Sequence, residues 1–171
     1  MKATVPCILA FASVLAAAPP KQVPPAPVPA QILAAKKVFV VNAGADIGTL
    51  PGQPFSGEPE RAYNSFYAAI KTWGHYQLVS APSDADLLME IRFTVHPIPL
   101  HSETITYWDA QFRLTIREPK TNALLWAMTE QVESALLQGN RDKNFDLALA
   151  RLTTDLQRLT APSTFPDSTS P

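Results

Sequence analysis

Hydrophobic and polar residues alternate along two stretches in the middle of the chain, residues 87–96 and 108–117. An alternation with a period of two is typical of β-strands that have one covered face and one solvent-exposed face. A third stretch, residues 124–132, follows a turn-forming segment and continues the pattern. We therefore predict an antiparallel meander of three strands. The inward side chains of the third strand are Leu124, Trp126 and Met128.

Apolar residues at spacings of three and four predict two helices, one on each side of this meander in the sequence. The first lies between Pro59 and Gly74, and the second covers residues 142–159. Short apolar runs at residues 37–42 and 76–80 flank the first helix and predict two strands, which a crossover helix makes parallel. The apolar stripe of the first helix contains Tyr63, Phe66, Tyr67, Ile70 and Trp73, and that of the second contains Phe145, Ala148, Leu149, Leu152, Leu156 and Leu159.

Together these elements predict an α+β fold in which two helices pack on one face of a mixed five-stranded sheet, in the order β-α-β-β-β-β-α. Charges on the outward face predict the register of two neighbouring strands. If Arg92 lies opposite Gln111, then Glu90 meets Arg113, whereas a shift by two residues would oppose Arg92 and Arg113. Directly opposed like charges are unfavourable, so we expect the first register.

The N-terminal part of the chain has the layout of an export signal followed by a proline-rich spacer. Lys2 precedes an apolar run that is too short to span a membrane as a helix, and small residues after it suit a signal peptidase. Prolines then cluster before the first predicted strand and favour an extended chain. We predict that the protein is periplasmic or secreted. The expected parts are a signal peptide (1–18), a proline-rich disordered spacer (19–35), a single α+β domain (36–160) and a disordered tail (161–171).

Composition narrows the classes of partner and of chemistry. The chain has 171 residues, a formal net charge of −1 and 46% hydrophobic residues, which indicates a globular domain without the basic field of nucleic-acid-binding proteins. The only cysteine, Cys7, follows Pro6 and precedes the apolar run instead of following it. This arrangement does not fit a lipidation signal, so we expect a released protein with no disulfide and no membrane span after signal cleavage.

No motif in the chain predicts a catalytic, metal-binding or cofactor-binding residue. Residues 40–48 form a strand followed by glycines, as in a dinucleotide-binding turn, but prolines soon after them prevent a helix from starting there. The histidines, His75, His96 and His101, lack the spacing of a metal-binding helix. No serine has an identifiable base, and we therefore expect no cofactor and no metal.

Some polar residues have both a structural and a functional interpretation. Asp84 and Asp86 stand just before a strand, where aspartates usually bond backbone N–H groups of a turn. Glu130 falls on an inward position, which a strand end or bulge can open to water. The outward sheet face is either a partner surface or an ordinary solvated face. It carries Glu90, Arg92, Gln111, Arg113 and Arg117.

The segment Ser83-Asp84-Ala85-Asp86 leads directly into the apolar strand that begins at Leu87. Together with the order of elements over residues 36–160, this segment resembles small bacterial envelope domains of unknown function. Those domains are similar in layout to the N-terminal domain of the Tol translocation protein and to penicillin-binding-protein activators. The resemblance implies no catalytic residues.

We therefore expect an exported, non-catalytic envelope domain that binds a protein or a cell-envelope component. The alternative is a small ligand-binding protein or a hydrolase with its site in the loops at residues 43–57 or 96–109. Such a site requires a concave pocket that holds converging polar groups from those loops.

Overall fold

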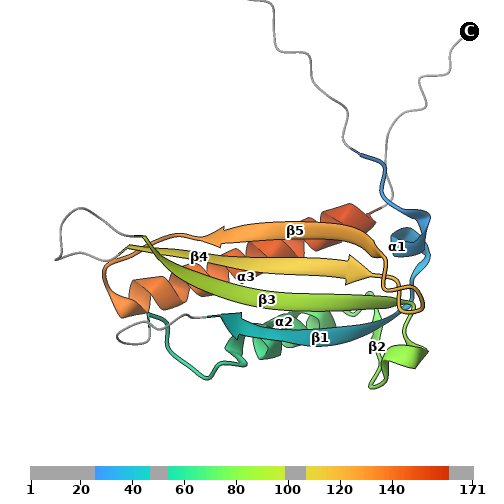
Figure 1. Ribbon diagram of the computed structural model, residues 1–171, viewed down its shortest axis with the longest axis horizontal. Coiled ribbons are helices and arrows are strands. Elements are labelled where there is room, and N and C mark those ends of the chain that lie inside the picture. Colours follow the sequence, from blue (N-terminus) through green and yellow to red (C-terminus); the bar gives the residue numbers. More distant parts are fainter. Residues whose placement is uncertain (1–25, 47–53, 99–106, 162–171) are drawn as a thin grey trace, which may run out of the picture.

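The computed structural model describes residues 26–46, 54–98 and 107–161 of the chain. Its strands are β1 (Lys37–Asp46), β2 (Gln77–Leu78), β3 (Leu87–Ile98), β4 (Tyr107–Arg117) and β5 (Leu124–Val132). They form one sheet in the order β2-β1-β3-β4-β5, in which β1 is parallel to both neighbours and β4 is antiparallel to both of its own. The long helices α2 (Arg61–Trp73) and α3 (Gln138–Thr160) lie together behind the sheet (Figure 1). The predicted α+β fold is therefore confirmed.

The hydrophobic core fills the space between the sheet and the two helices. Every second residue of β3 from Leu87 to Val95 points into it and is at most 4% exposed, as the alternation predicts. Helix α2 adds Phe66 and Ile70, and α3 adds Phe145 with the apolar residues that follow it. Full burial of one such side chain contributes about 1.5–3 kcal/mol. Burial therefore fixes which face of each strand meets the helices.

The helices have the predicted apolar stripes but differ slightly in extent. Helix α2 ends at Trp73 because Gly74 takes a left-handed conformation (φ 69°) and donates its N–H to the carbonyl of Ile70. Tyr67, expected in the stripe, is exposed, and α3 begins at Gln138, before the predicted residue 142. Within the described residues, no helix combines the length and the apolar character that a membrane-spanning helix requires.

The folded domain begins before residue 36, so the prediction of a disordered spacer up to residue 35 is wrong at its end. A short helix, α1 (Ala30–Ala34), starts with a hydrogen bond from Ile32 N–H to Pro29 O (3.0 Å), and the Ile32 side chain is fully buried. The proline cluster ends at Pro29, and the next five residues are good helix formers with one side chain to bury. The predicted signal peptide, the earlier part of the spacer and residues 162–171 lie outside the described residues.

Strand β1 is longer than predicted because a bulge lets it continue past Asn42. One extra residue separates the pairs Asn42–Ile91 and Ala45–Phe93, and Gly44 takes a positive φ of 79° within the bulge. Its N–H donates to Asn42 Oδ1 (2.9 Å). The prediction of a loop from residue 43 is therefore wrong for residues 43–46, which belong to β1. Gly44 belongs to a strand and opens no helix, unlike the glycine of a dinucleotide-binding turn.

The register predicted for β3 and β4 is wrong. Arg92 lies opposite Arg113, not opposite Gln111, and Glu90 lies opposite Thr115. This is the register that the charges disfavour. The contacts that favour the observed register lie on the other face of the same strands.

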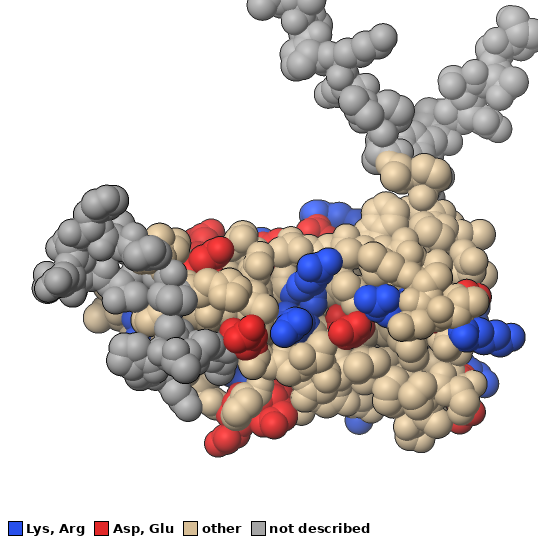
Figure 2. Space-filling view, in the orientation of Figure 1, with Lys and Arg blue, Asp and Glu red and all other residues tan. Residues whose placement is uncertain are grey.

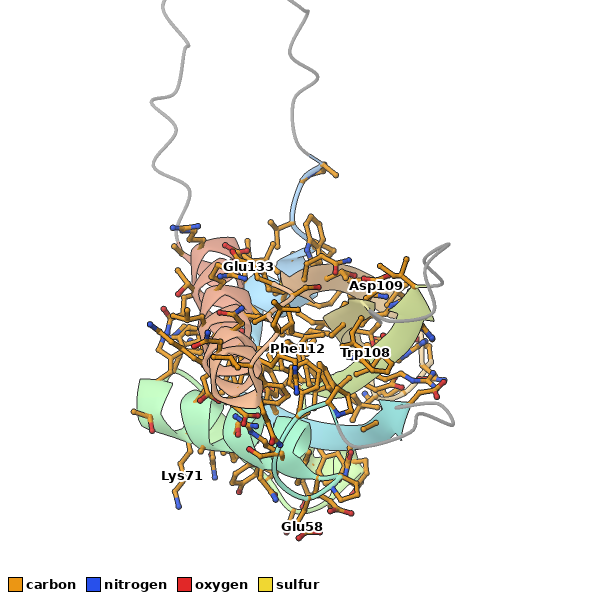
Figure 3. All side chains as sticks on the ribbon, turned by 90° about the vertical axis from the view of Figure 1, so that its left-hand side faces the viewer. Glu58, Lys71, Trp108, Asp109, Phe112 and Glu133 are labelled. Carbon is orange, nitrogen blue, oxygen red and sulfur yellow. The ribbon has the colours of Figure 1, made fainter. Side chains whose placement is uncertain are left out.

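On the buried face, the observed register brings aromatic rings together. Phe93 lies opposite Phe112 with ring centroids 4.9 Å apart, and Phe145 of α3 lies 5.0 Å and 4.7 Å from them. Figure 3 shows Phe112 in the middle of the layer between α3 and the sheet. Each such aromatic pair is worth about 0.5–1.5 kcal/mol beyond its buried area, whereas one opposed pair of exposed like charges costs about 0.2–1 kcal/mol. Three ring pairs therefore outweigh one repulsive pair.

Strand β5 follows its prediction except at its first residue. Trp126 and Met128 pack partly buried against the core, but Leu124 is 51% exposed because the pairing shifts between Ile116 and Arg117. Glu130 does lie on the helix-covered face, opposite Phe112. It forms an ion pair with Arg151 of α3, so a neighbouring helix satisfies the carboxylate without a bulge.

Candidate functional site

Residues of β1, β3 and β4 line a hollow on the sheet face opposite α2 and α3. Figure 2 looks onto this face and shows Lys and Arg side chains gathered near its middle, with Asp and Glu side chains on both sides. The volume of the hollow is about 500 Å³. We call it the open-face hollow. Its lining residues are Asp46, Glu90, Arg92, Thr94, His96, Gln111, Arg113, Thr115 and Arg117.

Arg92 and Arg113 are the unbalanced charges of this hollow. They are directly opposed on β3 and β4, and both are exposed. Neither forms an ion pair with any of the described residues. The open-face hollow therefore has a positive centre in which two guanidinium groups present their hydrogen-bond donors to solvent.

Glu90 lies beside these arginines, but its carboxylate already accepts hydrogen bonds from other residues. Its Oε2 atom accepts a hydrogen bond from Thr115 Oγ1 (3.1 Å) and a charged one from Arg117 Nε (3.4 Å). Arg117 also donates to the carbonyl oxygen of Asn122 (3.1 Å). These contacts hold the Glu90 carboxylate toward Arg117. The negative charge of Glu90 is therefore paired with Arg117 and not with Arg92 or Arg113.

The bulge in β1 places Asp46 at the rim of the open-face hollow. Val38 and Val40 point into the core, and without the bulge the period of two would send Asp46 to the same side. The extra residue reverses the alternation, so Ala45 pairs with Phe93 and packs against the core, while Asp46 pairs with Thr94 on the open face. A backbone irregularity thus adds a carboxylate to the lining.

Thr94 contributes an unused hydroxyl to the same lining. Its Oγ1 atom is buried and has no hydrogen-bond partner among the described residues. A buried hydroxyl without a partner costs about 1–3 kcal/mol relative to a satisfied one. This free donor and acceptor lies on the strand that carries Arg92.

The histidines do not assemble a metal or catalytic site among the described residues. His75 stacks on Trp73 (ring centroids 4.8 Å apart), and His96 lies on the open face opposite Asp109; His101 lies outside the described residues. No group of three or more His, Cys, Asp or Glu residues gathers within the described ranges.

A small apolar cavity lies against the described end of the first of the two loops proposed as alternative sites, and Asp46 and His96, one from each loop range, line the open-face hollow. The cavity measures about 40 Å³ and lies between Phe55, Phe93 and Phe145, with Arg61 at its side. A water molecule needs roughly 10–15 Å³ of such volume, so this cavity has room for no more than a few waters. The central parts of both loops, residues 47–53 and 99–106, lie outside the described residues.

Asp86 has a structural role, because it joins the start of β3 to the start of the neighbouring strand β1. Its Oδ2 atom accepts hydrogen bonds from the backbone N–H groups of Lys36 (2.9 Å) and Lys37 (2.8 Å), and its own N–H donates to Lys37 O (2.9 Å). The prediction of a local turn is therefore wrong for Asp86, whose partners are about fifty residues away. These hydrogen bonds, first from Lys36 and then from Lys37, hold the pKa of Asp86 below its usual value.

We expect Asp86→Ala to lower the free energy of unfolding by about 1 kcal/mol at pH 7, since an exposed carboxylate that accepts backbone N–H groups contributes modestly. A lowered folded-state pKa stabilises the protein above the ordinary value of 3.8 and stops doing so as the pH falls through the folded-state pKa. The difference between wild type and variant should therefore close in acid, as urea unfolding across this pH range can measure.

Asp84→Ala is the matched control for this prediction. Asp84 lies in the short 3-10 turn η1 (Pro82–Asp84), and its carboxylate accepts only a 3.3 Å hydrogen bond from Ser83 among the described residues. Its replacement should change stability by less than about 0.5 kcal/mol at any pH. Equal losses in the two variants would contradict the role given to Asp86.

The sequence identifies part of this site and misses the rest. Alternation places Glu90, Arg92, Gln111 and Arg113 on one face, and the structure brings all four into the open-face hollow. Asp46 escapes sequence prediction because only a bulge places it there. The glycine at position 44, inside an otherwise β-forming run, is the signal from which that bulge could be predicted.

No family model and no curated protein sequence matches the chain. Solved structures with a similar layout include a homologue of neuraminyllactose-binding hemagglutinin from Helicobacter pylori (10% identity, 82% of this chain and 91% of that chain, TM-score 0.49). A protein of family DUF330 from Xanthomonas campestris matches at 16% identity (79% and 89% covered, TM-score 0.45), and a lipoprotein from Neisseria meningitidis at 9% (72% and 99%, TM-score 0.41).

Similarity at this level transfers no function to the chain. None of these three proteins is a Tol translocation protein or a penicillin-binding-protein activator. The likeness in layout to those two families therefore stays a prediction.

Proposed function

We propose that this protein is an exported, non-catalytic envelope domain that binds a protein or a cell-envelope component through the open-face hollow. One observation carries the proposal: Arg92 and Arg113 are directly opposed, exposed and unpaired among the described residues. Stability alone favours a neutral or oppositely charged pair at such a position. Places where a sequence breaks a local rule without a local compensation are typical of functional sites.

The shape and polarity of the hollow support a binding surface more than an enclosed site for a small molecule. Small-molecule sites are mostly apolar clefts that bury most of their ligand. The open-face hollow is lined by charged and polar side chains on an open sheet. Arginine is enriched at protein interfaces, where its planar group makes several directed contacts at once.

The arrangement of groups also supports a non-catalytic role. A catalytic constellation needs a nucleophile or acid held by a base within hydrogen-bond distance. The hydrogen bonds of the hollow join Glu90 to Thr115 and Arg117 and leave His96 outside them. The N-terminal leader predicted from the sequence supports export, and it lies outside the described residues.

Site-specific cross-linking in intact cells tests this proposal. A photoreactive amino acid at Thr129, which is exposed and lies directly beside Arg113 on the open face, should give discrete adducts in envelope fractions. The same amino acid at Asp155, exposed on α3, serves as the control and should not give them. An absence of adducts at Thr129, or the same adducts at both positions, would overturn the proposal.

A further inference from the structure

We infer that Arg92 and Arg113 together bind an acidic side chain of a protein partner, in the manner of a two-armed carboxylate clamp. This inference rests on the proposed function and specifies the chemistry of the partner. The partner presents an aspartate or glutamate to the centre of the open-face hollow.

The chemistry of the two side chains supports a carboxylate as their ligand. Each guanidinium group has five N–H donors in a fixed plane, and a carboxylate has two oxygens that accept such donors in pairs. Among the described residues, neither Arg92 nor Arg113 donates a side-chain hydrogen bond to any acceptor, whereas Arg61, Arg117, Arg141, Arg151 and Arg158 all do. One anion between the two groups adds two attractions, which offset the repulsion between the guanidinium groups.

The described acidic residues nearest the pair either interact with other groups or lie too far along the strand. Glu90 accepts hydrogen bonds from Thr115 and Arg117. Asp46 has an interaction of its own and forms no ion pair with either arginine among the described contacts. Asp109 lies opposite His96, four residues from Arg113, which is about 13 Å along an extended strand. Among the described residues, no carboxylate pairs with the two guanidinium groups, and we therefore assign the required anion to the partner.

Charge distribution favours a protein carboxylate over a lipid or a phosphate. Anionic membranes attract clusters of about four to eight basic residues, whereas two carboxylates line this hollow beside its three arginines and no lysine does. Phosphate sites typically use backbone N–H groups at helix ends, and this site lies in the middle of a sheet whose backbone groups are paired. A single carboxylate has two acceptor oxygens, one for each of the two guanidinium groups.

The first test combines the cross-linker at Thr129 with Arg92→Gln/Arg113→Gln in the full chain. Adduct yield should fall by about tenfold or more, because truncating one side of an interfacial charge pair weakens binding strongly. Arg158→Gln on α3, which is also exposed, is the matched control and should leave the yield unchanged. The double variant should unfold at the same or a higher urea concentration than wild type, since a repulsive pair has been removed, so lost binding cannot be attributed to misfolding.

The second test uses defined probes with the purified protein. A hexaglutamate peptide should bind wild type in a salt-dependent manner, lose about tenfold or more of its affinity in the double glutamine variant, and bind the Arg158→Gln variant normally. Arg92→Glu/Arg113→Glu should reverse the preference toward a hexalysine peptide. Binding to phosphatidylglycerol vesicles or to inorganic phosphate without binding to hexaglutamate would overturn the inference.

The two proposals fail in distinguishable ways. If wild type gives Thr129 adducts whose yield is unchanged in the double glutamine variant, the carboxylate clamp is wrong and the open-face binding surface stands. If wild type gives no Thr129 adducts, the proposed function itself is wrong.

Discussion

Replacing Phe112 with alanine should lower the free energy of unfolding by about 3–5 kcal/mol, the largest effect that we expect from a single substitution in this domain. Phe112 is fully buried and lies in ring contact with Phe93 on β3 and Phe145 on α3. Its removal leaves a cavity at the place where the sheet meets the helix. Because domains of this size are stable by about 5–15 kcal/mol, urea unfolding should show a large shift of the midpoint.

Leu147→Ala is the control for this prediction. Leu147 is an apolar residue of α3, but it is 47% exposed on the outer side of the helix. Its replacement should change the free energy of unfolding by less than about 0.5 kcal/mol. A loss at Phe112 no larger than the loss at Leu147 would show that the ring cluster is not the centre of the core.

Replacing Arg61 with alanine should lower the free energy of unfolding by about 2–3 kcal/mol. Arg61 on α2 donates to Asp142 and Asp146 of α3, at 2.8 Å each, and to the carbonyl of Ser56 at 2.9 Å. Its guanidinium carbon also lies 4.1 Å from the centre of the Phe145 ring, a cation–π contact worth about 0.5–2 kcal/mol. One side chain thus joins both helices and the segment before α2.

The second partner in this network gives the prediction a pH signature. Partial burial raises the pKa of Asp142, but hydrogen bonds from Ser56 and Arg61 lower it by more than burial raises it. The resulting pKa lies below the usual value of 3.8. The ion pair therefore stabilises the protein above that value and is lost as the pH falls through the folded-state pKa. The stability difference between wild type and Arg61→Ala should shrink in acid.

Two variants separate the network from a simple loss of charge. Arg61→Lys keeps the charge but cannot reach both aspartates and stack on Phe145, so it should lose about half of the stability that Arg61→Ala loses. Arg158→Ala removes an exposed i,i+3 pair with Asp155 and should cost about 0.3–0.5 kcal/mol. If Arg61→Ala cost no more than Arg158→Ala, the network would be an ordinary surface contact.

The elements of the fold follow from the sequence because each has a strong local period. The alternation through β3 and β4 and the stripes of α2 and α3 place the apolar residues on one side. Helix α1 is harder to predict because it has only one turn and a single buried anchor, Ile32. Its folding depends on a partner surface that only the assembled core provides.

The register of β3 and β4 could not be predicted from the charges on their outward face. Repulsion between Arg92 and Arg113 favours a register in which they are not opposed. The observed register opposes them, and on the other face it brings Phe93 opposite Phe112. Both registers keep the same residues inward, so the hydrophobic pattern alone cannot distinguish them. The choice depends on how the rings meet Phe145 of α3, a contact between residues far apart in the chain.

The candidate site is predictable only in part for the same reason. The alternation of the sequence predicts that Arg92 and Arg113 share one face of the sheet. That they lie directly opposite each other results from the packing of aromatic rings in the core. Asp46 reaches the open-face hollow only through the β1 bulge. Binding residues on this face are thus positioned by features that lie on the other face or in the backbone.

The bulge in β1 also bears on the unpaired outer edge of this strand. Strand β2 pairs with only Lys37 and Val38, so the rest of the outer edge of β1 has no strand partner among the described residues. An exposed, regular edge is a template for aggregation. The bulge and the positive φ of Gly44 bend this edge out of the flat geometry that another strand would need. We therefore expect this irregularity in β1 to disfavour edge-to-edge pairing with another strand, at the same residues that turn Asp46 toward the open face.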